Sequence, residues 1–328
     1  MTEQEYRQHP ALNYSLLAAL DKDPKSTQEE REISYDQIEG KVLDKTLFDK
    51  DNFFDEFYIL DESKLIEDKP LEIANALFEE LRGVDPGKNM VVSLARRFDY
   101  YNNYKDEEKL YNKVWNTIKQ YYQALAEAGN RYIITHETYQ WALIAVEELK
   151  AHEFTRDLIY TNDPDITITF QKPLFWKRDR KEAHELKGLL DIEVRNDKEK
   201  WVRMVDLKKA GRKSFESDFY SYRYYIQEGM YKDGLVINYP KYKVLPSAFV
   251  VSYRKDPKRP DVFYISKSQH VIHKYGGYFP NGKFVKGYLQ LADEFKWHTE
   301  KDLWDYSKET YFNRGKHLEK LTENDPTK

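Results

Sequence analysis

The stretch Leu186–Lys208, LKGLLDIEVRNDKEKWVRMVDLK, decides the fold. Two apolar runs, 186–194 and 201–207, flank the turn-forming residues Arg-Asn-Asp-Lys at 195–198. Apolar strands separated by such a turn predict an antiparallel β-hairpin. Each arm also carries a carboxylate among apolar neighbours, Asp191 on the first and Asp206 on the second.

The two carboxylates and a nearby lysine predict a reactive site. Side chains alternate along a strand, so Asp206 and Lys208 share a face that Asp191 can reach from the neighbouring strand. Charges among apolar residues are costly unless they are paired or bind a metal. Two carboxylates can hold Mg²⁺, and a bound metal lowers the pKa of a water and stabilises charge on a phosphate. Lys208 would then orient or deprotonate that water or balance phosphate charge. A structural salt bridge on an edge strand is the alternative.

Outward from the hairpin, hydrophobic periodicity predicts helices on the N-terminal side and a mixture of strands and helices on the C-terminal side. The expected helices are 16–20, 35–48, 71–82, 107–128, 135–151, 217–234 and a last one from about 287, and the further strands are 166–170, 248–253 and 262–265. The order is helices, then β-β-β-α-β-β, then a helix. It predicts an α/β (α+β) fold with a central mixed β-sheet flanked by helices and a helical N-terminal half.

The same pattern suggests three parts within one integrated domain. Residues 1–155 form a mainly helical N-terminal part, 156–300 form the core, and 301–328 form a helical and polar C-terminal tail.

The amino-acid composition favours some classes of protein and excludes others. Hydrophobic residues make up 40% and aromatic residues 15% of the 328 residues, which favours a folded core over disorder. The absence of Cys excludes disulfides, thiolate zinc sites, iron–sulfur clusters and a cysteine nucleophile. No stretch approaches the roughly 20 apolar residues of a membrane span, and none is typical of a signal peptide. We therefore expect no membrane association and a cytoplasmic location, the host cytoplasm if the chain is phage-encoded.

Charge is distributed unevenly along the chain. The net charge is −4, yet residues 172–213 hold 14 Lys and Arg against 8 Asp and Glu. This basic segment surrounds the candidate site and favours nucleic-acid binding, with an ordinary solvated surface as the alternative. Lys209, Arg212 and Lys213 directly follow the second strand and are candidates to clamp DNA phosphates.

Three spaced motifs resemble a known family. Gly188-x-x-Asp191, Asp206-x-Lys208 and Gln227-x-x-x-Tyr231, in this order, are similar to the PD-(D/E)XK nuclease superfamily, in particular its RecB-like and phage-type exonuclease VIII (RecE)-like branch. The resemblance covers about residues 12–300 and implies the central sheet of that family. It also implies that Gln227 and Tyr231, which share a helix face, line the DNA groove near the phosphate to be cut.

The resemblance extends to a metal site with two departures. The segment from Gly40 to Asp44 resembles the family's Gly-x-x-x-His helix, with Asp44 where the exonuclease branch has a metal-binding His. Aspartate oxygen suits Mg²⁺, and Mn²⁺ can substitute. Gln171 stands where an acidic residue could begin the hairpin, which leaves one or two metals open. The implied metal ligands are Asp44, Asp191, Asp206 and the backbone carbonyl of Leu207.

Taken with the resemblance, the motifs predict a Mg²⁺-dependent DNA exonuclease of phage-type recombination or replication. The implied catalytic residues are Asp191, Asp206, Lys208, Gln227 and Tyr231. The expected partners are DNA, further copies of the chain in a homo-oligomer, and a single-strand annealing protein. Two alternatives stay open: a structure- or sequence-specific endonuclease on the same core, and a catalytically silent module that binds DNA or protein.

Overall fold

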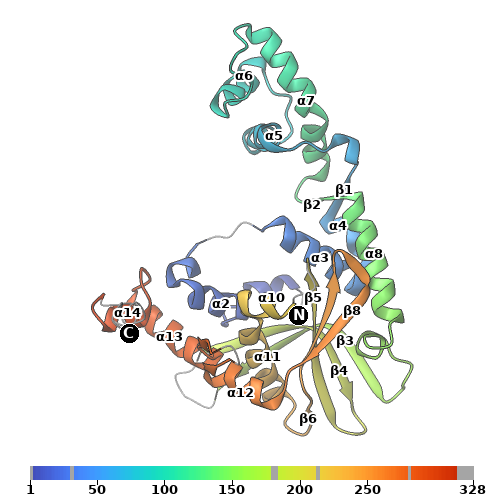
Figure 1. Ribbon diagram of the computed structural model, residues 1–328, viewed down its shortest axis with the longest axis vertical. Helices are drawn as coiled ribbons and strands as arrows, with labels where there is room; N and C mark the ends of the chain where they lie inside the picture. Colours follow the sequence, from blue (N-terminus) through green and yellow to red (C-terminus); the bar gives the residue numbers. More distant parts are fainter. Residues whose placement is uncertain (1–2, 30–32, 179–183, 212–214, 280–281, 316–328) are drawn as a thin grey trace, which may run out of the picture. The chain divides into compact units, whose positions relative to one another are not determined.

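The computed structural model describes residues 3–29, 33–178, 184–211, 215–279 and 282–315 (Figure 1). The chain forms two compact units. One combines Met1–Ile33 with Glu147–Lys328 and contains the large sheet, and the other is Ser34–Val146. We call them the sheet unit and the helical unit.

The sheet unit is built on a six-stranded mixed sheet. Its main path runs β3-β4-β5-β7-β8, and β6 pairs with β5. The β5–β7 and β5–β6 pairs are parallel, and the other neighbours are antiparallel. The strands are β3 (Ile166–Lys177), β4 (Glu185–Asn196), β5 (Trp201–Ala210), β6 (Lys243–Val244), β7 (Ala248–Tyr253) and β8 (Asp256–Tyr264).

The predicted hairpin is confirmed as β4 and β5, which pair from Ile192↔Val205 to Asn196↔Trp201. Asn196 closes the turn, because its side-chain oxygen accepts hydrogen bonds from the backbone of Lys198 at 3.0 Å and Glu199 at 2.7 Å. This is the local bonding that favours Asn in turns.

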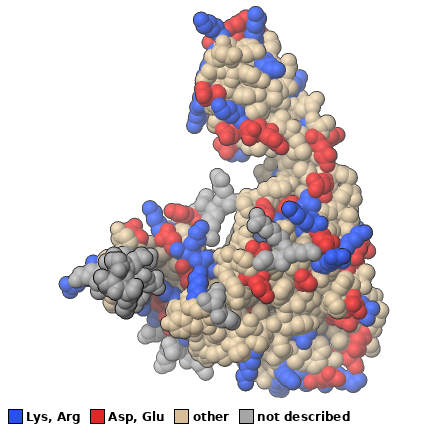
Figure 2. Space-filling model, viewed as in Figure 1, with Lys and Arg blue, Asp and Glu red and all other residues tan. Residues whose placement is uncertain are grey.

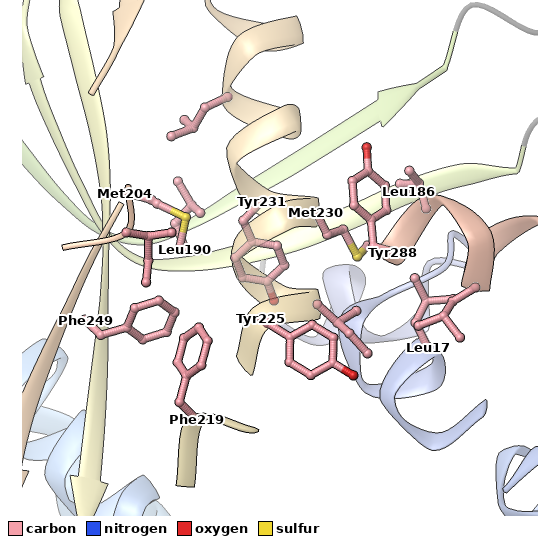
Figure 3. Packing of buried hydrophobic residues seen from close by; sticks show 14 of the residues in the cluster. Leu17, Leu186, Leu190, Met204, Phe219, Tyr225, Met230, Tyr231, Phe249 and Tyr288 are labelled. Carbon is pink, nitrogen blue, oxygen red and sulfur yellow. The ribbon is translucent and has the colours of Figure 1, made fainter. Parts of the chain in front are cut away.

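Helix α11 (Tyr224–Asn238) connects β5 to β7 and packs on one face of the sheet. A parallel pair of strands needs such a crossover. Ten of its residues are buried, and they include Gln227, Glu228 and Tyr231. Figure 3 shows Met230 and Tyr231 on this helix, with Leu190, Met204 and Phe249 of the strands on one side and Leu17 of α2 on the other. The main core of the unit therefore lies between the sheet and α11.

The remaining elements of the sheet unit surround this core. They are α1 (Glu3–Gln8), α2 (Tyr14–Lys22), η1 (Pro24–Thr27), α9 (Arg156–Ile159), α10 (Phe215–Ser221), α12 (Lys267–Tyr275), β9 (Gly277–Tyr278), β10 (Phe284–Val285), α13 (Tyr288–Lys301) and α14 (Lys308–Phe312). The N-terminus joins the sheet through a parallel bridge between Leu12 and Leu186. The buried Lys187 ammonium reinforces this contact, because it donates to the carbonyls of Tyr6 at 2.8 Å and His9 at 2.7 Å.

One sequence prediction was wrong. The helix expected at 217–234 is two helices, α10 and α11, separated by Tyr222 and Arg223. Arg223 adopts a left-handed backbone conformation with φ of 61°, and such a residue cannot continue a right-handed helix. Tertiary contacts described below hold it there.

The helical unit has its own core. It contains α3 (Tyr35–Phe48), η2 (Lys50–Asn52), α4 (Phe53–Glu56), β1 (Phe57–Leu60), η3 (Glu62–Lys64), α5 (Asp68–Leu81), α6 (Lys88–Arg97), α7 (Glu107–Ala128) and β2 (Tyr132–Thr135), and α8 (His136–Ala151) crosses into the sheet unit. Helices α5, α6 and α7 pack around Ile73, Val91 and Leu110, while β1 and β2 form a parallel pair. Helices α3 and α7 have the predicted bounds.

The fold class is therefore as the sequence predicts: a mixed α/β chain whose central mixed sheet is flanked by helices, with a mainly helical stretch before the sheet. No described helix is both long and apolar enough to cross a bilayer.

Candidate active site

The two predicted carboxylates lie where the β4–β5 ladder ends. The last registered pair is Ile192↔Val205, and Asp191 and Asp206 hold the next position on each strand. The neighbouring β3–β4 ladder passes directly from Phe170↔Ile192 to Lys172↔Leu190, without a pair at Asp191. The Asp191 carboxylate instead accepts a hydrogen bond from the Leu207 backbone N–H at 2.9 Å. Because Asp191 has no registered partner on either neighbouring strand, its side-chain oxygen can accept a hydrogen bond from the backbone of β5.

Asp206 is held between a cation and an amide. Its side chain is 1% exposed, forms an ion pair with the Lys208 ammonium, and accepts a hydrogen bond from Gln227 Nε2 at 2.6 Å. Lys208 comes from the same strand and Gln227 from α11. The structure therefore brings together four of the predicted residues, Asp191, Asp206, Lys208 and Gln227.

The charged side chains of this cluster shift each other's pKa values. Burial raises the pKa of Asp206, and the nearby Lys208 ammonium only partly offsets this effect. Burial alone would lower the pKa of Lys208, but the carboxylates of Asp206 and Asp191 outweigh it and hold the pKa well above its usual value. Lys208 is therefore a cation at neutral pH, and further positive charge near Asp206 would favour its ionised form.

The donor set fits a hard divalent cation. Gln227 Oε1 is buried and has no hydrogen-bond partner among the described residues, and it belongs to the amide that contacts Asp206. Among those same residues, no three His, Cys, Asp or Glu side chains are arranged to hold a metal. Mg²⁺ needs only one or two carboxylates, because water and substrate phosphates complete its shell. Each carboxylate oxygen also has more than one acceptor position. Asp206 can therefore bind a cation in addition to its contacts with Lys208 and Gln227.

Two tyrosines that the sequence analysis did not assign to the site surround Lys208. The ammonium lies 4.6 Å from the centroid of the Tyr224 ring, within the range of a cation–π contact. Burial raises the pKa of Tyr14, and the field of Lys208 acts against that shift, which places this phenol near the cation. The only sequence signal was the density of tyrosines before α11, which does not indicate which ring faces the site.

Tyr231 packs against the first residue of the Gly188-x-x-Asp191 motif. A Cβ at Gly188 would lie 2.7 Å from two carbons of the Tyr231 ring. Tyr231 is 6% exposed. The glycine is needed because the ring lies directly on the strand backbone, so the structure gives Tyr231 a packing contact that links α11 to β4. Its predicted catalytic contact stays a prediction.

The other predicted residues have varied placements. Lys209 is half-buried, and strand alternation directs it to the sheet face opposite Lys208. Arg212 and Lys213 lie outside the described residues. Asp44 lies on α3 in the helical unit. The roles proposed for these four residues stay predictions.

Several cations of the basic segment pair with nearby acids. Arg178 contacts Asp293 at 3.2 Å, and Lys198 contacts Asp165 at 2.7 Å. In the view of Figure 2, basic and acidic side chains are interspersed on the surface. Part of the charge excess thus lies in ion pairs with acidic side chains of the same chain.

A second buried charge cluster escaped the sequence analysis. Glu228, which follows Gln227, is fully buried and accepts hydrogen bonds from Ser247 Oγ at 2.8 Å and from His273 Nδ1 at 2.7 Å. His270 Nδ1 lies 3.1 Å from the same carboxylate. Burial would raise the pKa of Glu228, but the bonds from His270 and His273 outweigh it and lower the pKa to about 2. This cluster joins α11 to α12 and to the start of β7.

A groove of about 650 Å³ lies on the other face of the sheet. Arg203 of β5 and Tyr264 of β8 line it, with the guanidinium 5.1 Å from the tyrosine ring centroid. Because Met204 packs in the core under α11, alternation along β5 directs Arg203 away from that helix. The groove is therefore separate from the Asp206 cluster.

No family model matches the chain, and no curated protein matches it. A solved structure from Eubacterium rectale, described as a "Putative exonuclease", covers 77% of this chain and 91% of its own, with 10% sequence identity and a TM-score of 0.37. At that score the likeness supports no functional argument.

Proposed function

We propose that this protein is a Mg²⁺-dependent DNA exonuclease. The observation that carries the proposal is the buried cluster at the end of the β4–β5 ladder, where Asp206 contacts both Lys208 and Gln227 beside Asp191. Burying the Asp206 charge beside two half-buried charges is costly unless the site has a use for it. Perturbed carboxylates and lysines gathered in this way are typical of catalytic sites.

The proposed metal ligands are Asp191, Asp206 and the backbone carbonyl of Leu207, with Asp44 as a further candidate. When bound, Mg²⁺ acidifies a water and stabilises the charge that develops on the phosphate, and Mn²⁺ can substitute.

The protein's own residues supply position and charge. Lys208 is fixed by Asp206 and Tyr224, so its ammonium can hold the attacking water or a phosphate oxygen without reorganising. Gln227 orients the Asp206 carboxylate through its amide. Arg212, Lys213 and, from the opposite sheet face, Lys209 are proposed to contact phosphates farther along the strand.

The choice of DNA ends as substrate rests on the resemblance of the three motifs to phage-type exonucleases. The same resemblance suggests work in DNA recombination or replication, within the host cytoplasm for a phage protein. A homo-oligomer and a single-strand annealing protein are the partners proposed on that basis.

A single assay separates the proposal from its alternatives. One end-labelled linear duplex and the same sequence as a covalently closed circle are incubated with the wild type or Lys208→Ala, in Mg²⁺ or in chelator. We expect metal-dependent loss of the linear DNA alone, and only with the wild type. Cleavage of the circle would show an endonuclease. Binding of both DNAs without cleavage would show a silent module.

A further inference from the structure

The junction between α10 and α11 is strained and held by α2. Arg223 has a left-handed backbone, which costs a residue with a side chain about 1–2 kcal/mol. Its Nε lies 2.5 Å from the Asp21 carboxylate, and the Tyr225 hydroxyl donates to the same carboxylate at 3.2 Å. The Tyr14 hydroxyl donates to the Tyr222 carbonyl at 2.6 Å. Backbone strain that is held by several tertiary contacts is often found where it positions a functional residue.

The effect of this junction is to expose Tyr222. The ring is 53% exposed although the turn before α11 is otherwise rich in packed aromatic side chains. It continues a series of neighbouring rings, of which the Phe249–Tyr224 pair is stacked and the Tyr224–Tyr222 pair is tilted. Phe249 lies 6.3 Å from Tyr224 at 26°, and Tyr224 lies 5.7 Å from Tyr222 at 31°. The series thus begins in the core and ends at a ring in contact with solvent.

The same series passes beside the charge cluster. Lys208 lies over the Tyr224 ring, so only one ring separates Tyr222 from the ammonium that pairs with Asp206. If a phosphate of a DNA strand lies at Lys208, a base of the same strand lies within reach of Tyr222. Bases stack on exposed aromatic rings irrespective of sequence.

We infer that Tyr222 forms a stacking site for an unpaired nucleobase of the strand that is cut, next to the phosphate at Lys208. This inference rests on the proposed function and deepens it. A base inside a duplex is already stacked on both sides, so the site favours DNA whose base next to the cut is unstacked. The substrate class is therefore a single strand or a frayed duplex end.

The kinetic test combines a protein change with a DNA change. Wild type, Tyr222→Ala and Tyr222→Phe are assayed on a linear DNA and on the same DNA with an abasic nucleotide next to the cleaved bond. We expect Tyr222→Ala to raise KM about tenfold with little change in kcat, and Tyr222→Phe to behave like the wild type. The abasic nucleotide should raise the KM of the wild type by a similar factor. It should cause no further rise in the KM of Tyr222→Ala.

Tyr264→Ala is the matched control, because Tyr264 is 52% exposed and lies in the groove on the opposite sheet face. Its KM should equal that of the wild type. If the abasic nucleotide impairs Tyr222→Ala as much as the wild type, the base does not stack on Tyr222 and the inference is overturned, while cleavage by the wild type still supports the nuclease.

A binding test does not depend on cleavage. Tyr222→Trp in an Asp206→Asn background is titrated with a twelve-nucleotide oligothymidylate and with an abasic strand of equal length. We expect the base-containing strand to quench the fluorescence added by the new indole and the abasic strand not to do so. Equal responses to the two strands would overturn the stacking site. Selective quenching of the Tyr222→Trp variant by the base-containing strand, together with a wild type that cuts no DNA, would instead count against the nuclease proposal alone.

Discussion

Asp191 and Asp206 occupy the first position beyond the last registered pair of β4 and β5. Like charges directly opposite each other destabilise a paired ladder. The β4–β5 ladder accordingly ends one position before the two carboxylates. The Leu207 N–H, two residues beyond the last pair on β5, bonds the Asp191 side chain. The same two carboxylates that lie just beyond the end of the β4–β5 ladder form the proposed metal site, and the charge of Lys208 interacts with both of them.

Asp206→Asn tests the centre of the proposed site. Removing one carboxylate from a metal site costs several kcal/mol of transition-state stabilisation, so we expect cleavage to fall by at least about 10³-fold. DNA binding and the circular dichroism spectrum should be retained. Asp165→Asn, in an exposed pair with Lys198, is the control and should cut normally. Comparable cleavage by Asp206→Asn would mean that the site is misassigned.

Asp44→Ala tests the ligand proposed from the helical unit. If Asp44 binds the metal, activity falls at low Mg²⁺ and is partly restored as Mg²⁺ or Mn²⁺ is raised. The measurement is cleavage rate against metal concentration, with Asp36→Ala on the same helix as control. An unchanged metal dependence in Asp44→Ala would remove Asp44 from the site.

Gly188→Ala tests the contact between the first and third motifs. The new methyl would lie 2.7 Å from the Tyr231 ring, so we expect a loss of about 1–3 kcal/mol in the free energy of unfolding. Urea denaturation measures it. Gly40→Ala, in a helix with open space around the position, should instead be neutral or stabilising. A second change, Tyr231→Leu, should recover part of the loss, and strict additivity of the two changes would contradict the contact.

Glu228→Gln tests the second charge cluster. Breaking a buried pair leaves uncompensated partners, so we expect a loss of about 3–5 kcal/mol in unfolding free energy. The variant should retain metal-dependent cleavage at low temperature if Glu228 only stabilises the fold. Loss of cleavage in a variant with an unchanged Tm would assign Glu228 to the site instead.

The pH dependence of stability follows from the same cluster. The folded pKa of Glu228 is lowered from 4.5 to about 2, so its contribution is present above pH 4.5 and is lost as the pH falls through about 2. Burial would lower the pKa of His270, but bonds to Asp233 and Glu228 raise it above 6.5, so its contribution is complete below pH 6.5 and is lost as the pH rises through the folded pKa.

We therefore expect the urea midpoint to fall as the pH rises above 6.5, and His270→Gln to flatten this decline. Lys232, Lys274 and the Tyr288 hydroxyl also face Glu228 or Asp233. Burial would lower the pKa of Lys274, but the hydrogen bond to Asp233 raises it above its usual value, and burial raises the pKa of Tyr288, so neither group titrates in this range. His136→Gln, an exposed histidine of the helical unit, should keep the wild-type slope. Parallel curves for wild type and His270→Gln would contradict the assignment.

Local pattern was enough to predict most elements. The helices Tyr35–Phe48 and Glu107–Ala128 and the strand Ala248–Tyr253 have the predicted bounds, because helical periodicity, capping residues and apolar strand runs are encoded in neighbouring residues. The pairing of β4 with β5 followed from the turn between them, and it placed Asp191, Asp206 and Lys208 together before any tertiary information.

The break at Arg223 and the buried Glu228 could not be predicted in the same way. Arg223 is left-handed because Asp21, about 200 positions earlier in the chain, holds it. Glu228 is stable in the core because Ser247, which precedes β7, and His270 and His273 of α12 contact it. Neither residue carries a local signal of these partners.

By itself, the sequence determined the order of elements, the hairpin, and the motif residues that gather around Asp206, since strand alternation and short turns act over few residues. Only the tertiary structure decided that Gln227 contacts Asp206, that Tyr231 lies on Gly188, and that Tyr222 faces solvent next to the Tyr224 ring. Those features depend on how α11 and α2 pack on the sheet, and packing is set by contacts between residues far apart in the chain.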